Sequence, residues 1–219
     1  MTIKHLLIGA AALAVLSLPA YAQSQSGTTS STSSTPATTP ATTPPPNIQQ
    51  RKDNQQDRIA QGIQSGQLTA GETKNLETKE AGVNKEESTM RSQDNGHLTS
   101  ADRSTINSQQ NKLSNQIYQD KHNAAQAHYG NNEVGQRRQA QQDRIAQGVK
   151  SGQLTPGETS KLENQQQGIN KEVGGMRQAN GGKLTTADKK AVNQQQNQAS
   201  KNIYNKKHNA ATTTAAKKP

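Results

Sequence analysis

Apolar residues recur between positions 51 and 126 at the spacing of amphipathic helices, separated by long polar stretches. The stripes are Ile59 and Ile63, then Leu76, Val83 and Met90, then Ile106, Leu113, Ile117 and Tyr118. Residues spaced three, four or seven apart share one face of an α-helix. Each stripe is narrow, so we predict a small bundle of three antiparallel helices around roughly ten apolar side chains.

The same pattern occurs a second time. Residues 51–126 align without a gap on residues 137–212 at a shift of 86, and just over half of the aligned positions are identical. The corresponding apolar residues are Ile145, Val149, Leu162, Ile169, Met176, Val192, Ile203 and Tyr204. We therefore predict an all-α fold made of two tandem small three-helix repeats, each helix–loop–helix–loop–helix, after a disordered N-terminal stalk.

Each repeat contains a weaker internal echo at a shift of 30. Gly66-Gln67-Leu68-Thr69 with Glu72 returns as Gly96-His97-Leu98-Thr99 with Asp102, and the second repeat has the equivalent segments 152–158 and 182–188. Gly turns the chain, Leu enters the core, and Thr-x-x-acid is typical of a capping box. Four helices are therefore predicted to begin at Thr69, Thr99, Thr155 and Thr185.

The segments outside the repeats have distinct compositions. Residues 1–22 combine Lys4, an apolar run and the small-residue site Ala20-Tyr21-Ala22, which predicts a cleaved secretory signal peptide and no transmembrane anchor afterwards. Residues 23–50 form a predicted disordered stalk rich in Ser, Thr and Pro, 127–136 a linker, and 213–219 a basic disordered tail. The expected location is periplasmic or secreted.

Charge differs sharply between the repeats. The first has ten basic and ten acidic side chains, whereas the second has thirteen basic and five acidic ones, a net charge of +8. This asymmetry suggests an anionic partner for the second repeat, although it is more often the sign of a solubilising surface. The candidate binding residues are Arg137, Arg138, Arg144, Lys150, Lys189, Lys190, Lys206 and Lys207.

An anionic envelope polymer or lipid headgroups are the expected partners. Nucleic acid is disfavoured, because export separates it from the chain and only 2% of residues are aromatic. The sequence has no Gly-x-Ser-x-Gly, phosphate-loop or His-Glu-x-x-His motif, so we predict a non-enzyme without a cofactor. The mean hydropathy of -1.07 keeps a second hypothesis open, a hydrophilic stress-protective protein.

Weak divalent-metal binding is a third hypothesis. The Gly-x-Leu-Thr-x-x-acid turns have the spacing of degenerate EF-hand loops, but Arg91 and Arg177 stand where the first ligand oxygen belongs. We therefore predict no metal site, and interpret Glu72, Asp102, Glu158 and Asp188 as helix caps. The pairs Tyr118–His122 and Tyr204–His208 are interpreted as core packing by Tyr with a helix end closed by Lys-His-Asn.

These turns, together with the Ile-Tyr-x-x-Lys-His-Asn segment, resemble a group of exported bacterial helical repeat proteins with degenerate EF-hand-like turns. The segment occurs as residues 117–123 and again as residues 203–209, so the resemblance covers both repeats. It implies an exported all-helical repeat architecture and assigns no residue a functional role.

Overall fold

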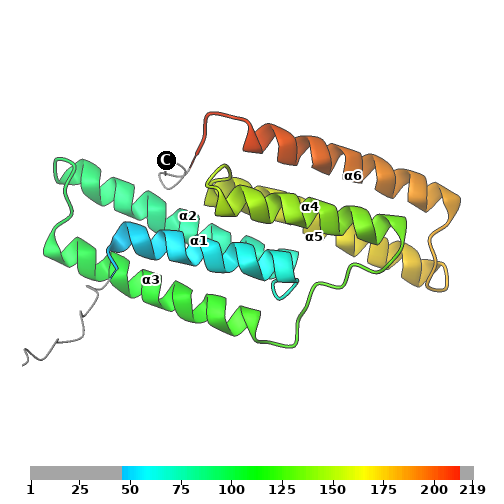
Figure 1. Ribbon diagram of the computed structural model, residues 1–219, viewed down its shortest axis with the longest axis horizontal. Coiled ribbons are helices and arrows are strands. Elements are labelled where there is room, and N and C mark those ends of the chain that lie inside the picture. The colour runs from blue at the N-terminus through cyan, green and yellow to red at the C-terminus, as the bar shows by residue number, and fades with distance from the viewer. Residues whose placement is uncertain (1–45, 213–219) are drawn as a thin grey trace, which may run out of the picture. The chain divides into compact units, whose positions relative to one another are not determined.

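The computed structural model describes residues 46–212, and all regular structure in this range is helical. The helices are α1 (Ile48–Ser65), α2 (Ala70–Gln93), α3 (Ser100–Lys121), α4 (Glu133–Lys150), α5 (Pro156–Ala179) and α6 (Thr186–Lys207). Helices α1–α3 belong to the first repeat and α4–α6 to the second, and within each repeat the chain runs alternately up and down (Figure 1). The predicted all-α fold is confirmed.

Capping boxes start the helices where the sequence predicts them. Thr69, Thr99, Thr155 and Thr185 are the N-caps of α2, α3, α5 and α6. In α2, Thr69 Oγ1 accepts the Glu72 amide at 3.3 Å while the Glu72 carboxylate accepts the Thr69 amide at 2.9 Å. Two unpaired helix-end donors are thereby satisfied in each box. The predicted capping role of the four acids is confirmed.

Two helices begin earlier than expected. The stalk was predicted to extend to residue 50, but α1 starts at Ile48 because Asn47 and Gln50 form a further capping box. The linker was predicted to extend to residue 136, but α4 starts at Glu133, where Asn132 accepts the Gly135 amide. Asn is a strong N-cap residue, and its side chain fixes both starts.

A buried leucine closes the turn after α1 and after α4. Leu68 donates its amide to Gly62 O at 2.9 Å and packs on Gly62, where an added Cβ would lie 2.6 Å from the leucine side chain. Leu154 and Gly148 repeat the arrangement. These helical glycines therefore permit a close approach that any larger residue would block.

The two repeats share one hydrophobic core. We expected a separate small bundle in each, but α1 packs on α4 and α2 packs on α5 across the repeats. The largest apolar cluster takes buried side chains from both: Ile59, Ala60, Ile63, Leu68, Leu76, Leu113 and Ile117, with Ile145, Ala146, Val149, Leu154, Leu162 and Ile203. Merging two narrow stripes removes more apolar surface from water than either repeat could bury alone.

A smaller apolar cluster lies within the second repeat. Its members are Val134, Ile169, Val173, Val192 and Ala199, with Met176 and Leu184 packed against them. At the position of Val173 the first repeat has Glu87, and at the position of Ala199 it has Leu113, which joins the shared core. The interiors of the two repeats thus differ at the end farthest from the Leu68 and Leu154 turns.

Several predictions concern residues outside the described range. The signal peptide at 1–22, the stalk through residue 45 and the tail at 213–219 lie there. Among residues 46–212, no helix combines the length and the apolar composition that a membrane crossing needs.

Candidate functional site

The eight basic residues predicted to bind an anionic surface are spread over the second repeat. Lys150, Lys189 and Lys190 are exposed, whereas Arg137, Arg138, Arg144, Lys206 and Lys207 are half-buried. Lys150 is the last residue of α4, and Lys189 and Lys190 lie near the start of α6. The full 24-residue length of α5 therefore separates the exposed lysines.

Most of the half-buried cations already have internal partners. Arg137 donates to the side chains of Asn193 and Asn197 on α6. Arg144 Nη2 donates to Ser200 Oγ at 3.1 Å, and Lys206 Nζ lies 3.8 Å from Glu158 Oε1. Burial, with the charge of Arg144 nearby, lowers the pKa of Lys207. These side chains hold α4, α5 and α6 together.

Arg138 faces the segment that connects the repeats. Its guanidinium lies over the Tyr129 ring, 5.5 Å from the centroid, which is a cation–π geometry. Burial lowers the pKa of Arg138, with a further contribution from the charge of Arg177. Burial also raises the pKa of Tyr129 to about 12. This pair belongs to a cleft between α4 and α5 that we call the second-repeat cleft.

A different cleft gathers unpaired cations. It has a volume of about 590 Å³ at the far end of the second repeat and is lined by Asn132, Glu133, Val134, Arg177, Gly182, Lys183, Leu184, Lys189 and Asn193. We call it the basic end cleft. Within the described residues, the side chains of Arg177, Lys183 and Lys189 have no hydrogen bond or ion pair. Glu133 is the one carboxylate in its lining, and it lies 4.0 Å from Arg137.

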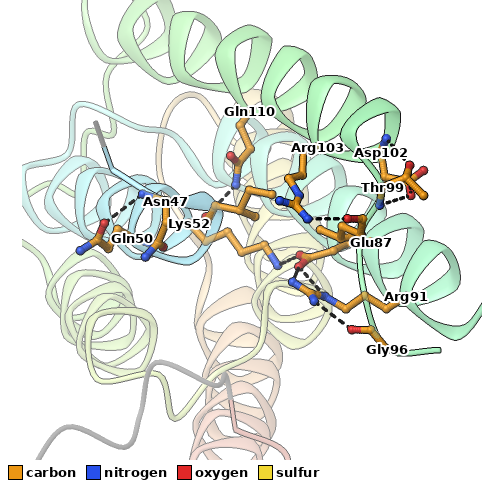
Figure 2. A network of polar contacts seen from close by, with 12 residues as sticks. Asn47, Gln50, Lys52, Glu87, Arg91, Gly96, Thr99, Asp102, Arg103 and Gln110 are labelled. Carbon is orange, nitrogen blue, oxygen red and sulfur yellow. Dashed lines mark hydrogen bonds and ion pairs between the residues drawn. The ribbon is translucent and has the colours of Figure 1, made fainter. Parts of the chain in front are cut away.

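In the first repeat, the equivalent of Arg177 is held by a carboxylate. Figure 2 shows Glu87 between Lys52 and Arg91, and Glu87 Oε1 accepts from Arg91 Nε at 3.0 Å and Nη2 at 2.8 Å. Burial opposes ionisation of Glu87, but the hydrogen bonds and charges of Lys52 and Arg91 hold its pKa below the usual value. Arg103, the counterpart of Lys189, donates to Leu98 O at 2.7 Å.

Sequence reasoning missed Arg177 and Lys183. The signal was present in the alignment of the repeats, because Val173 replaces Glu87 and thereby removes the carboxylate partner of the following arginine. Lys183 also replaces His97. Counting net charge per repeat did not show that Arg177 lacks the carboxylate partner of its counterpart Arg91.

Carboxylates are also buried between the repeats. Glu77, Glu80 and Glu163 are at most 1% exposed. Burial raises the pKa of Glu80 to about 7 and that of Glu163 to about 8. Burial raises the pKa of Glu77 well above its usual value, and the charges of Glu80 and Glu163 add to this. Glu77 therefore lies within electrostatic reach of both other carboxyls, and the interior favours the protonated forms of all three.

Among residues 46–212, no group of three or more His, Asp or Glu is placed to hold a metal ion. Tyr118 and His122 stack with ring centroids 4.2 Å apart, and Tyr204 and His208 do so at 4.1 Å. The predicted core packing of these tyrosines is wrong, since Tyr118 is 63% and Tyr204 61% exposed. The histidines are the C-caps of α3 and α6, as the Lys-His-Asn segments indicate.

Comparison with known proteins gives no relative. No family model, curated protein or solved structure matches the chain.

Proposed function

We propose that this chain is a non-enzymatic interaction protein, located in the periplasm or secreted, whose second repeat binds an anionic polymer or surface. The observation that carries the proposal is the basic end cleft, where three cationic side chains line one concave surface without a carboxylate partner of their own. Arg177 presents a planar fork of donors suited to carboxylate or phosphate groups. Lys183 and Lys189 add point charges beside it.

Two further features favour an anion in this cleft. Asn132, Glu133 and Val134 bring the N-terminal end of α4 into the lining, and the partial positive charge of a helix N-terminus attracts anions. The cleft also has Leu184 and Val134 in its wall, which lowers the local dielectric and strengthens each ionic contact. An extended polymer with repeated negative charges fits an open cleft of this kind.

Replacing Arg177, Lys183 and Lys189 together by Gln tests the proposal. We expect binding to phosphatidylglycerol vesicles and to soluble polyphosphate to weaken roughly tenfold at low salt, because each exposed contact contributes about 0.5 kcal/mol. In the intact protein, affinity should fall steeply towards 0.15 M salt, where exposed charges are screened within about 8 Å. Co-sedimentation and titration calorimetry measure both.

The first repeat supplies a matched control. Arg91→Gln, His97→Gln and Arg103→Gln change the counterpart positions, where the arginines already have internal acceptors. This control should leave binding almost unchanged. Losses in proportion to the charge removed, three units in the test and two in the control, would show that net charge, and not the basic end cleft, determines binding.

A sharper variant keeps every cation in place. Val173→Glu installs the first repeat's own residue, which should pair with Arg177 and reduce anion binding. Because Val173 is only 2% exposed, helicity and thermal midpoint must be measured in parallel. A folded Val173→Glu protein that binds as strongly as the original would contradict the proposed role of Arg177.

A further inference from the structure

The second-repeat cleft combines one cationic side chain with a wall of uncharged polar groups. It measures about 280 Å³ and is lined by Thr69, Ala70, Gln126, Ala127, His128, Tyr129, Arg138, Gln142, Gln166 and Asn170. None of these ten residues is Asp or Glu. The volume lies just below the roughly 300–1,000 Å³ of pockets that hold drug-sized ligands, so the cleft suits one small molecule and not a polymer.

The hydrogen-bond donors of Arg138 have no acceptor. The Tyr129 ring covers one face of the guanidinium, whose Cζ lies 5.5 Å from the ring centroid. The five N–H groups of a guanidinium lie in its plane, so a ring over its face leaves them free. Among residues 46–212, no oxygen accepts from Arg138, and no carboxylate contributes to the shift of its pKa. An anionic ligand would supply the partner that this half-buried cation lacks.

The first repeat shows the same position with internal partners. The counterpart Lys52 forms an ion pair with Glu87 (Figure 2). The charge of Lys52 also acts on Glu80, and lowers the pKa of that carboxyl. In the second repeat, Val173 and Gln166 stand in place of Glu87 and Glu80. Both carboxylates around the cation are thus replaced by uncharged residues, while the cation changes from lysine to arginine, whose planar fork matches a carboxylate.

The charged groups just outside the lining do not oppose an anion. Arg177 acts on Arg138, and Asp143 acts on Tyr129, so one cation and one carboxylate offset each other. Glu163 is 0% exposed, and burial raises its pKa to about 8. At neutral pH this carboxyl is therefore mostly protonated and uncharged. The positive charge of Arg138 determines which ligand the cleft favours.

Three amide side chains line the cleft together with Arg138. Asn170 Oδ1 is buried and accepts no hydrogen bond. Gln142 and Gln166 are held in place, because their Nε2 groups donate to buried acceptors at 2.9 and 3.0 Å. Amide side chains both donate and accept hydrogen bonds, as hydroxyl groups do. A ligand that satisfies the arginine and the amides therefore combines one carboxylate with several hydroxyl groups.

We propose that the second-repeat cleft binds a small hydroxy acid, whose carboxylate pairs with Arg138 and whose hydroxyl groups bond to the amide side chains. The size of the cleft suits a single sugar acid. This site is separate from the basic end cleft, and it does not depend on the polymer binding proposed there.

Glucuronate is the probe for the full chain, with glucose and acetate as matched controls. Glucose lacks the carboxylate, and acetate lacks the hydroxyl groups. At constant ionic strength, we expect saturable glucuronate binding that shifts the side-chain amide resonances of Gln142, Gln166 and Asn170 in NMR spectra. Glucose and acetate should each bind at least about tenfold more weakly. Absence of saturable glucuronate binding, or equal affinity for acetate, would overturn the proposal.

Two variants test the pairing with Arg138. Arg138→Gln should weaken glucuronate binding roughly tenfold or more, because a charge-assisted hydrogen bond is lost. Gln166→Glu installs the first repeat's own carboxylate near Arg138, and should weaken binding to a similar extent while every cation remains. Circular dichroism checks that both variants keep their helices.

A double variant distinguishes this site from the basic end cleft. Lys183→Gln with Lys189→Gln removes two positive charges from that cleft, and should leave glucuronate binding unchanged while binding to phosphatidylglycerol vesicles weakens. Arg138→Gln should have the opposite pattern. A folded Arg138→Gln protein that binds glucuronate as strongly as the original would contradict the proposal, whatever happens to vesicle binding. A loss of glucuronate binding in the double variant as large as that in Arg138→Gln would contradict it as well, since net charge would then explain both.

Discussion

The two repeats have the same order of three helices, and the second and third helices of each begin with the same kind of capping box, but their interiors differ. At three corresponding positions the first has Lys52, Glu80 and Glu87, whereas the second has Arg138, Gln166 and Val173. The first therefore contains a partly exposed ion-pair network, and the second buries an apolar cluster. Both interiors fit the same three-helix frame because the capping boxes that start the second and third helices are present in both repeats. The difference determines which arginine is left without a partner.

One hydrogen bond between buried side chains is present in the second repeat and absent from the first. In the second repeat, Gln166 Nε2 donates to Gln141 Oε1 at 3.0 Å. In the first, the counterpart Gln55 Oε1 has no donor, and neither does either oxygen of Glu80. A protonated Glu80 can supply the missing O–H to a neighbouring acceptor, whereas an ionised one leaves buried oxygens unsatisfied. A protonated Glu80 would thus donate a hydrogen bond in the first repeat, as the amide of Gln166 does in the second.

The largest expected effect comes from substitutions in the hydrophobic core that the two repeats share. Ile59→Ala and its counterpart Ile145→Ala each empty a site that is 0% exposed in the common core. We expect each to lower the free energy of unfolding by about 4 kcal/mol. Urea titration followed by circular dichroism should show one transition for all helices in both variants. Loss of only half the helical signal would mean that the repeats are stable separately.

The next prediction is that the free energy of unfolding depends on pH. Since the pKa values of Glu80 and Glu163 are raised to about 7 and about 8, the folded state holds protons that an unfolded chain releases near pH 4. The stabilisation from these protons is complete below that pH and is lost as pH rises through 7 to 8. We expect each group to lower the free energy of unfolding by about 1.4 kcal/mol per pH unit between pH 5 and its pKa in the folded state. Urea midpoints across this range measure it.

Glu80→Gln should remove part of that dependence. The substitution installs the second repeat's own residue and provides a donor for Gln55 Oε1. Stability should rise by roughly 2 kcal/mol at pH 9 and change little at pH 5. The matched position is already Gln166, so Gln166→Glu should do the reverse. A pH profile that is the same in all three proteins would show that these carboxyls do not titrate between pH 5 and pH 9.

The smallest effect concerns a feature common to both repeats. Thr69→Ala and Thr155→Ala each remove the side-chain acceptor of a capping box. A cost of about 1 kcal/mol is expected for each, because one buried helix-end amide loses its partner. Thermal and urea midpoints measure it, with the exposed Thr105→Ala as a control that should change stability by less than about 0.5 kcal/mol. A large difference between the two cap variants would indicate that the caps are not equivalent.

Much of the fold could be predicted from local patterns. Thr-x-x-acid at fixed spacing located four helix starts, because a capping box depends only on neighbouring residues. The merged core could not be predicted, since a narrow apolar stripe does not specify which helix covers it. Buried polar residues such as Gln55, Gln110 and Glu77 also made each stripe look narrower than the interior face is.

The candidate site was harder to predict than the fold. Net charge pointed to the second repeat, where the basic end cleft lies, but did not point to the cations in that cleft, because pairing of charges depends on tertiary neighbours. Arg137 and Arg144 look available in the sequence, yet they donate to α6. Arg177 looks like its counterpart Arg91 until Glu87 is known to be the partner of Arg91. Tyr118 and Tyr204 were placed in the core because aromatic rings are usually buried, but each stacks on an exposed histidine.

The pairing of α1 with α4 and of α2 with α5 has an evolutionary consequence. Equivalent helices of the two copies meet each other, so the covered face is self-complementary, as in an isologous homodimer. A single ancestral copy would have exposed that face, including its isoleucines, and would have needed a second molecule to cover it. Gene duplication would then have converted a concentration-dependent association into a single chain, after which the two halves were free to diverge in charge.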